Sequence, residues 1–597
     1  MKNKKLFSAV ILGAAATMTL AACGGGKEAG KGGDINNATQ TEDVSKFPVK
    51  TSHEGKIKDG GTMEVAVVSD SQFKGMFSET FYEDAYDNEF MQPSHEGLFR
   101  SDSNFETTDH GIAKKEIDVD KKTIKIKIVK DAVWSDGEPL KAEDIIQPYL
   151  IIGNKDYAGI RYGSDFTNIV GMDEYHEGKS DSISGIKKLD DKTVEITYKE
   201  MNPGMKQTSE TVWTAAMPSH IFKDMPVKGM ESSDPVRKNP VTLGPYKMEK
   251  INQGESVEFT PNEYYYGEKP KLDKIVMRIA PSNSIVEALK AKKYDMVFSM
   301  PTDNYPNYKD VEGYEILGRQ DLAYTYIGFK LGTWNEEKGE AEYDPNAKMA
   351  DKSLRQAMGF ALDNDAVANK FYNGLRQPAN AIIPPIFSEF SDKELVGYSK
   401  QDKDKANKLL DDAGYKKKDG DEFRSTPDGK PLEINFASMA GGETEQPLAE
   451  YYVDSWKEIG LDVKLATGRL IEFNSFYDKL KSDSPDIDVY QAAWGLSADP
   501  SQSGLYGKDA AFNFTRFVSD ENTRLLDEID SEKSFDNEYR TEKFKEWQAY
   551  VADETFVIPT LFRDAVLPVS DRVVDFDWAY DVESNPWSHV GVVEDDK

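Results

Sequence analysis

The sequence predicts an α/β protein of two lobes that is exported and tethered by its N-terminus. Three observations support this prediction: an apolar leader that ends in the only cysteine, a strand–helix–strand order near residues 275–298, and the return of that order after about residue 320. A length of 597 residues allows two to four domains at about 100–200 residues each. The composition, with 38% hydrophobic residues, is that of a globular protein.

Residues 1–22 have the layout of a lipoprotein signal peptide. Three lysines give a positive start, and the apolar residues 6–20 are too few for a comfortable membrane span. Residues 20–23, Leu-Ala-Ala-Cys, match a bacterial lipobox. We therefore expect Cys23 to carry a diacylglyceryl lipid that holds the protein on the extracellular face of the cell membrane. An ordinary signal peptide with a coincidental cysteine is the alternative.

Residues 23–57 are expected to form a flexible tether, because they are rich in Gly, Lys, Asn and Thr and hold few apolar side chains. No second apolar run approaches the length of a membrane span. An exported chain with one cysteine has no internal disulfide, so a large core must stabilise it.

The formal net charge of −32 argues against nucleic acid as a partner, because an acidic surface repels phosphate backbones. Most of this charge is expected on solvated helix faces.

The first lobe is expected to combine strands with a crossover helix. Strand patterns lie at residues 62–68, 123–129, 189–197, 275–279 and 294–298, and a helical pattern lies at 284–293. The order strand, helix, strand over residues 275–298 predicts parallel pairing. Residues 90–230 are expected to be mostly β.

The second lobe is expected over residues 319–552, where the same alternation returns. Helical patterns lie at residues 354–371, 404–413, 443–459 and 470–481, and strands at 432–436, 461–465 and 487–494. A helix at 538–554 and a strand at 555–562 follow.

The sequence contains none of the catalytic motifs for which it was searched. No Gly-x-Ser-x-Gly nucleophile motif is present, and the only cysteine is assigned to lipid. None of the six histidines forms a His-Glu-x-x-His motif, and no phosphate loop or calcium loop appears. We expect no catalytic residue, no metal and no cofactor.

Aromatic side chains near strand ends and turns suit a binding cleft. They are residues 264–266, Tyr324, Tyr326, Trp334, Tyr490 and Trp494. Each alone is more often a core or rim residue. Together, in a two-lobed exported fold, they favour a cleft for an extended and chemically mixed ligand.

Several motifs in order resemble the family-5 extracellular solute-binding proteins of ABC importers. They lie at residues 121–145, 243–246, 262–267, 353–363, 405–415 and 493–500. The matches extend over residues 58–594, nearly the whole mature chain. Residues 380–387 and 472–475 are similar to the lactococcal-type oligopeptide-binding lipoproteins of Gram-positive bacteria.

The resemblance implies a two-lobed periplasmic-binding-protein-like fold of class II, cluster C, with an extra β-rich subdomain at about residues 90–230. Lobe one would comprise residues 58–318 and 553–597, and lobe two residues 319–552. A ligand would be trapped between the lobes.

The resemblance also implies which residues contact a peptide. These are Ser69, Asp70, Ser71, Tyr324, Asn474, Trp494, Gly495, Leu496 and Ser497. Peptide backbones offer the same N–H and C=O groups whatever their sequence, so strand-like pairing binds many peptides.

The chain departs from the family pattern after Trp494. Enterobacterial relatives carry an Asp there that pairs with the amino terminus of the peptide, whereas this chain has Gly495, Leu496 and Ser497. Asp499 of this chain aligns better with the acidic residue of the acidic-Pro pair that comes next in those relatives. Without that ion pair, peptide length would be poorly fixed and longer peptides would fit.

The resulting expectation is a lipid-anchored, monomeric receptor that delivers oligopeptides to the permease subunits of an ABC importer. Alternatives are a receptor for a signalling peptide, a binder of sugar, metal or haem on the same fold, an exported peptidase, and a surface adhesin or folding helper. The scarce histidines argue against metal and haem.

Overall fold

The computed structural model of the chain describes residues 42–209 and 211–593. The described residues belong to a single compact unit. The signal peptide, Cys23 and the first part of the expected tether lie outside the described residues. Among those that are described, no helix has the length and apolar character needed to cross a bilayer.

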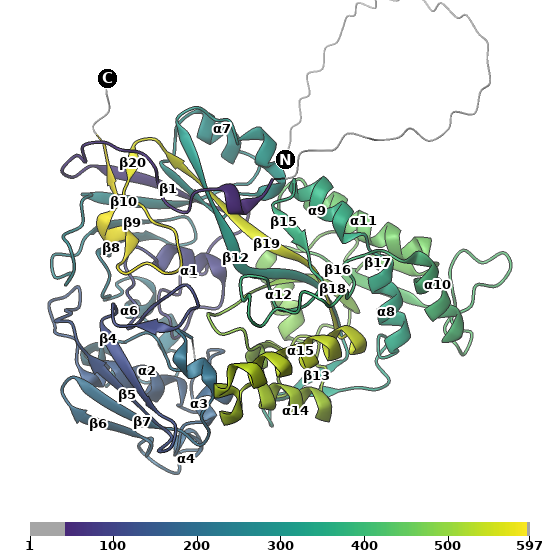
Figure 1. The fold of residues 1–597 in the computed structure, drawn as a ribbon, viewed down its shortest axis with the longest axis horizontal. Coiled ribbons are helices and arrows are strands. Elements are labelled where there is room, and N and C mark those ends of the chain that lie inside the picture. Colours follow the sequence, from purple (N-terminus) through teal and green to yellow (C-terminus); the bar gives the residue numbers. More distant parts are fainter. Residues whose placement is uncertain (1–41, 210, 594–597) are drawn as a thin grey trace, which may run out of the picture. The chain divides into compact units, whose positions relative to one another are not determined.

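A mixed sheet of eleven strands organises the molecule (Figure 1). Its order is β17-β16-β18-β12-β19-β11-β1-β10-β9-β8, and β15 pairs with β19. The bounds are β1 (Thr62–Val68), β8 (Tyr246–Asn252), β9 (Ser256–Pro261), β10 (Lys274–Ala280), β11 (Met296–Phe298), β12 (Tyr314–Phe329), β15 (Arg376–Pro378), β16 (Glu433–Ala437), β17 (Asp462–Leu465), β18 (Val489–Gly495) and β19 (Val557–Ser570).

Two long antiparallel strands, β12 and β19, connect the two halves of this sheet. We call them the hinge strands. The first lobe is the half with β1 and β8–β11, and the second lobe is the half with β15–β18. The register of the hinge strands shifts between Gln320 and Tyr324, which interrupts the ladder where the two halves meet.

The parallel pairing expected in the first lobe is present. β1 lies between β10 and β11 and runs parallel to both, and α7 (Ile285–Lys290) forms the crossover. β1 is buried along most of its length, as expected for a central parallel strand.

The subdomain inserted in the first lobe carries a four-stranded antiparallel sheet. Its order is β4 (Ala113–Asp118), β5 (Thr123–Ile128), β7 (Thr193–Thr197), β6 (Ile186–Asp190). Helices α2 (Ala142–Ile152), α3 (Ser164–Thr167) and α4 (Met172–His176) accompany this sheet, so the segment is less purely β than the sequence predicts. Helix α2 was not predicted because residues 145–152 are apolar apart from Gln147 and include Pro148, which hides the helical period.

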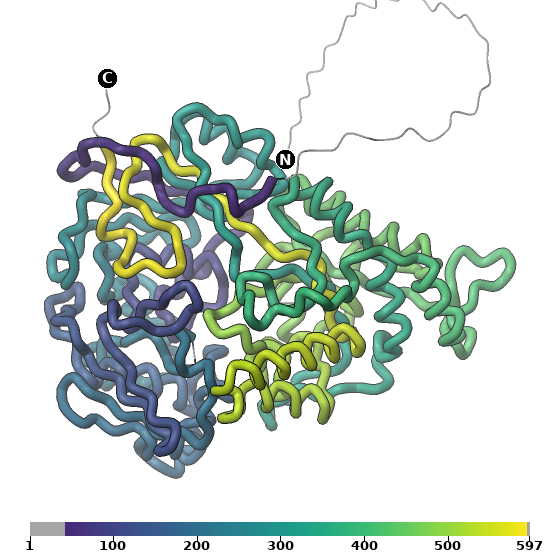
Figure 2. The backbone as a smooth tube through the Cα atoms, in the orientation of Figure 1, coloured from purple at the N-terminus to yellow at the C-terminus, as the bar shows by residue number. Residues whose placement is uncertain are grey.

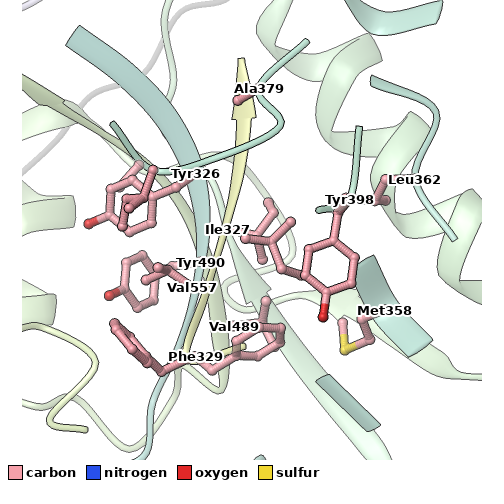
Figure 3. Packing of buried hydrophobic residues seen from close by; sticks show 14 of the residues in the cluster. Tyr326, Ile327, Phe329, Met358, Leu362, Ala379, Tyr398, Val489, Tyr490 and Val557 are labelled. Atoms are coloured by element: carbon pink, nitrogen blue, oxygen red, sulfur yellow. The ribbon is translucent and has the colours of Figure 1, made fainter. Parts of the chain in front are cut away.

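Helices surround the strands of the second lobe. They are α8 (Lys352–Phe360), α9 (Asn364–Tyr372), α10 (Lys403–Asp412), α11 (Glu445–Glu458), α12 (Phe473–Lys481), α14 (Asp520–Ile529) and α15 (Asn537–Glu554). The helical pattern at residues 354–371 is divided in two, because Asp363 caps α9 by accepting from the backbone N–H of Ala366. Figure 3 shows the core there, where Ile327 and Phe329 of β12 pack with Val489 of β18.

Short elements complete the fold. They are α1 (Ala85–Met91), β2 (Arg100–Ser101), β3 (Thr107–Thr108), α5 (Ser219–Phe222), α6 (Asp234–Arg237), β13 (Gly332–Asn335), β14 (Glu340–Tyr343), α13 (Ser503–Tyr506), β20 (Val573–Val574), α16 (Pro586–His589), β21 (Gly591–Val592), and the 3-10 turns η1 (Val44–Lys46), η2 (Pro203–Lys206), η3 (Met230–Ser232), η4 (Thr302–Asn307) and η5 (Glu532–Phe535).

The expected tether differs from the structure at its end. Residues 42–57 pack against the fold, and Figure 2 shows this purple segment running beside the yellow C-terminal segment. The backbone N–H of Thr51 donates to the carbonyl of Phe576, and Ile57 bridges Val593. Composition could not reveal this docking because its partners lie far away in the sequence, from Glu315 to Val593. The predicted lobe boundary at 318/319 falls inside β12 and stays a prediction.

Candidate functional site

Two cavities adjoin the interrupted stretch of β12. The large cavity has a volume of about 1290 Å³ and lies between the subdomain and the second lobe. The hinge cavity has a volume of about 250 Å³ and lies at the end of β1, against both hinge strands. Leu496 lines the large cavity and donates its backbone N–H to the carbonyl of Leu322, whose neighbour Asp321 lines the hinge cavity. One backbone hydrogen bond therefore connects the wall of the large cavity to the strand whose Asp321 lines the hinge cavity.

Size and lining make the large cavity suitable for an extended ligand. Its volume exceeds the ~300–1,000 Å³ of pockets for drug-sized molecules. The subdomain contributes Asn168, Asn202 and Ser209, and the second lobe contributes Ser497 and Phe512. Polar groups that both donate and accept hydrogen bonds suit the backbone of a peptide.

Carboxylates outnumber cations around the large cavity, nine to four. The carboxylates are Asp165, Glu200, Asp499, Asp509, Asp520, Asp527, Glu528, Asp530 and Glu532, and the cations are Arg161, Lys508, Arg524 and Lys533. Burial and then the neighbouring Asp499 raise the pKa of Asp530, and burial and then Asp509 raise the pKa of Asp527. These carboxylates repel one another, so the cavity favours positive charge on its ligand.

Asp499 is engaged within the protein. It is buried, and its Oδ1 lies 2.8 Å from Nη2 of Arg540. The backbone N–H of Ser501 also donates to Oδ1, over 3.1 Å. This carboxylate is thus already paired within the protein, and the expected absence of an ion pair to the peptide's amino terminus stays a prediction.

The predicted residues at the end of β18 reach the large cavity in part. Gly495, Leu496 and Ser497 line it. Trp494 lies behind them, with its ring 5.4 Å from that of Phe514 and nearly parallel to it. Its ring also stands at a steep angle to Phe512, 5.3 Å between centroids, and Phe512 does line the cavity. Trp494 therefore supports the aromatic wall.

The predicted residues after β1 line the hinge cavity instead. The hydroxyl of Ser69 donates to the carbonyl of Ser71 over 2.8 Å, which tightens the turn. The Asp70 carboxylate accepts from the backbone N–H and the hydroxyl of Ser282, at 2.9 and 2.5 Å. The hydroxyl of Ser71 donates to Glu472 Oε1 over 2.7 Å and so joins the first lobe to the second.

Asn474 and Tyr324 occupy different surroundings. Nδ2 of Asn474 lies 3.4 Å from Glu472 Oε1, beside the contact that Ser71 makes. Tyr324 is fully buried, and its hydroxyl lies 2.8 Å from both Gln502 Oε1 and the Tyr506 hydroxyl. The structure thus places six of the nine predicted residues, 69–71 and 495–497, in the walls of two neighbouring cavities. Trp494, Asn474 and Tyr324 line neither cavity, and Tyr324 is buried in the core. Their contacts with a peptide stay a prediction.

Further contacts join the lobes on either side of the cavities. Near the hinge cavity, the rings of Tyr86 and Phe473 are 5.4 Å apart. Beyond the large cavity, Lys122 of the subdomain lies 2.9 Å from Glu532. Lys206 lies over the ring of Phe535, which extends this contact. A ligand in the large cavity is therefore flanked by both lobes.

The hinge cavity also contains charged residues that sequence reasoning missed. Arg376 of β15 and Arg563 of β19 both line it. Arg319 lies between the rings of Trp578 and Tyr580, at 4.2 and 4.0 Å from their centroids. These residues are far apart in sequence, and only the pairing of strands brings them together, so no local motif could have revealed them.

Metal-binding geometry is lacking in the part of the chain that the structure describes. No group of three or more His, Cys, Asp or Glu side chains there is placed to hold a metal ion. Burial lowers the pKa of His95 to about 4, so this histidine is neutral at physiological pH.

Comparison with known proteins places the chain among transport proteins. A family profile described as "Bacterial extracellular solute-binding proteins, family 5 Middle" matches residues 108–515. The chain is 36% identical to the oligopeptide-binding protein OppA of Lactococcus lactis subsp. lactis, over 100% of this chain and 99% of the relative. It is 25% identical to the oligopeptide-binding protein AppA of Bacillus subtilis, over 71% of this chain and 74% of that one.

Solved structures agree with this placement. Lactococcal OppA, complexed with an endogenous peptide in the closed conformation, superposes with a TM-score of 0.86 at 37% identity and covers 89% of this chain and 100% of its own. AppA from Bacillus subtilis, in complex with a nonapeptide, has a TM-score of 0.75 at 20% identity, over 90% of this chain and 100% of its own. The second likeness concerns the fold alone.

Proposed function

Because the chain belongs to the bacterial extracellular solute-binding proteins of family 5, we propose that it captures oligopeptides between its two lobes and delivers them to an ABC importer. The observation that carries the proposal is the large cavity between the lobes, in a chain that is similar over its full length to an oligopeptide-binding protein. The lactococcal relative was solved with a peptide bound and closed, and it shares 37% of its sequence with this chain.

The physical basis is a wide polar cavity without a fixed anchor for the amino terminus. Asp499 is held by Arg540, so peptides of different lengths fit without leaving a charge unpaired at a set position. Backbone hydrogen bonds supply affinity that does not depend on peptide sequence. Ligand contacts with both lobes stabilise the closed state, and the importer reads that difference.

The protein acts without catalysing a reaction on its ligand, as a monomer held at the extracellular face of the cell membrane by lipid on Cys23. The lipobox at residues 20–23 supports the anchor. Replacing Cys23 by Ala abolishes labelling by a fatty-acid probe and releases the protein from the membrane fraction. Unchanged labelling of C23A would refute lipidation.

Calorimetric titration tests the central proposal. The nonapeptide RPPGFSPFR should bind in a one-to-one complex, and mass spectrometry after hours of incubation should recover it uncleaved. Maltose and nickel chloride serve as ligands of the competing classes. Binding of either of them with no binding of peptides would contradict the proposal, and a cleaved peptide would contradict the absence of catalysis.

A further inference from the structure

The first described residues of the chain cross the hinge. Residues 42–48, which we call the strap, include η1 and precede the segment that docks beside the C-terminus. At one end of the strap, the carbonyl of Pro48 accepts from the backbone N–H of Gly318 on β12, over 2.9 Å. At the other end, the backbone N–H of Glu42 donates to the carbonyl of Asn373, over 3.1 Å. Because Asn373 caps α9 of the second lobe, the strap contacts both lobes.

Phe47 packs the strap onto the hinge. Its ring stands edge-on to the ring of Tyr305 in η4, which follows β11 of the first lobe, with 5.9 Å between the centroids. Gly318 allows this approach, because a Cβ there would lie 2.7 Å from the Cβ of Phe47. The apolar cluster that Phe47 packs against contains Tyr305 and also Leu375, a fully buried residue between α9 and β15. The strap therefore lies where side chains of both lobes meet.

Asn373 is the junction between the strap and the two lobes. It adopts a left-handed conformation with a φ of 57°, and its Nδ2 donates to the carbonyls of Thr302 and Asp303, at 3.1 and 3.0 Å. Its own carbonyl accepts from Glu42. The Glu42 carboxylate also lies 3.6 Å from Lys309, but both groups are partly exposed, so this ion pair adds little. The backbone of the strap thus extends a contact between the lobes that Asn373 begins.

The segment after the strap is fixed to the first lobe. Thr51 donates its backbone N–H to the carbonyl of Phe576, which is buried in the same apolar core as Val65 of β1. A rotation of the second lobe carries Asn373 with it, while this docking holds the strap on the first lobe. The bond between Glu42 and Asn373 therefore belongs to the arrangement in which the lobes contact each other.

We propose that the strap is a conformational device that favours closure of the lobes by bonding Glu42 to Asn373 across the hinge. Without this bond the equilibrium shifts toward the open state, so bound peptide leaves faster. Residues 24–41 connect the strap to Cys23, so the proposed lipid anchor is joined to the fold beside the hinge. This inference rests on the proposed function and adds to it a control of peptide release by the N-terminal segment.

Removal of a single N–H tests the bond. E42P removes the donor to Asn373, because proline has no backbone N–H, whereas E42A keeps the donor and loses only the carboxylate. Calorimetry measures the affinity of the detergent-solubilised full-length protein for RPPGFSPFR, and stopped flow measures the release of the fluorescein-labelled peptide. E42P should lower the affinity about two- to tenfold, the worth of one hydrogen bond, and speed release by a similar factor. E42A should behave as the wild-type protein.

The ring of Phe47 offers a second test. F47A removes the packing on Tyr305 and leaves the backbone of residue 42 unchanged. We expect it to speed peptide release in the same direction as E42P. V49A, at an exposed apolar residue just beyond the strap, is the matched control and should release peptide at the wild-type rate. If E42P does not fold, F47A decides.

The outcomes separate the strap from the proposed function. Unchanged affinity and release in both E42P and F47A would overturn the strap while leaving peptide binding intact. Equal effects of E42P and E42A would overturn it as well, because the bond is lost in only one of them. Weaker binding that comes from slower association alone would also contradict a role in holding the closed state. No binding of peptide to the wild-type protein would contradict the proposed function and this inference together.

Discussion

The ion pair between Asp499 and Arg540 fixes the loop that follows β18. Both side chains are buried, and Asp530 lies 3.9 Å from the same guanidinium. Two carboxylates share one cation, so removing the cation leaves buried negative charge without compensation.

The variant R540M tests this arrangement. It should lower the free energy of unfolding by about 3–5 kcal/mol, as measured by urea denaturation. The control R524A removes an exposed arginine that pairs with Glu521 and Glu528, and it should leave the free energy of unfolding almost unchanged because solvent screens these pairs. Equal losses of unfolding free energy in R540M and R524A would show that burial does not increase the contribution of the Asp499–Arg540 pair to stability.

The subdomain approaches this loop closely at Gly204. A Cβ at Gly204 would lie 2.0 Å from Oδ2 of Asp499, which Arg540 holds in place. We expect G204A to lower the free energy of unfolding by about 1–3 kcal/mol, the usual cost of overpacking. Gly163 has no atom within 4 Å of its ideal Cβ, so G163A is the control for steric crowding; it should lower stability less than G204A, by no more than the cost of Ala at the N-cap of α3. If G204A is as stable as the wild-type protein, the Asp499 side chain moves away from the added methyl group without cost, and the prediction is wrong.

At the scale of elements, hydrophobic periodicity predicted the helices and strands whose burial follows a regular pattern along the chain. β1, β5, β10, α7 and α11 fall where periodicity placed them, because each buries one face or its whole length. The long strand β12 was not predicted, since its register shift and charged residues interrupt the pattern.

The candidate site likewise contains residues that the sequence predicted and residues that it could not predict. The family resemblance selected residues 69–71 and 495–497 in the sequence, and in the structure these residues line the two cavities. Arg376 and Arg563 could not be predicted, because a register between β15 and β19 brings them together from positions 187 residues apart.

One hydrogen bond between elements tests closure of the lobes. S71A removes the donor to Glu472 but leaves that side chain free to cap α12 through Ser475. Peptide affinity should fall about two- to tenfold, the worth of one hydrogen bond. S282A removes a hydroxyl that bonds within the first lobe and should change affinity less. Equal effects would show that the bond between the lobes does not favour closure.

At the scale of the whole molecule, buried carboxyls set the pH dependence of stability. The pKa of Glu89 and of Asp564 is raised to about 7 by burial. In the unfolded chain they release their protons near pH 4, so between about pH 4 and pH 7 the folded state binds more protons. Stability therefore falls as pH rises through this window. His95, whose pKa is lowered to about 4, acts in the opposite direction up to about pH 6.5.

We thus expect the melting temperature to fall from about pH 5 to about pH 7.5, because the raised carboxyls outnumber the buried histidine. D564N should flatten the profile by removing one titrating group. A wild-type melting temperature that rises across this range would contradict the assignment of these carboxyls as buried and unpaired by cations.

Capture of peptides between two lobes is the central claim, and native mass spectrometry of the gently purified protein tests it most directly. The account predicts protein ions that carry a ladder of co-purified peptide masses, which would also give the range of peptide lengths. Protein that is bare and ignores an added peptide library, or that carries a single sugar or metal, would contradict the account.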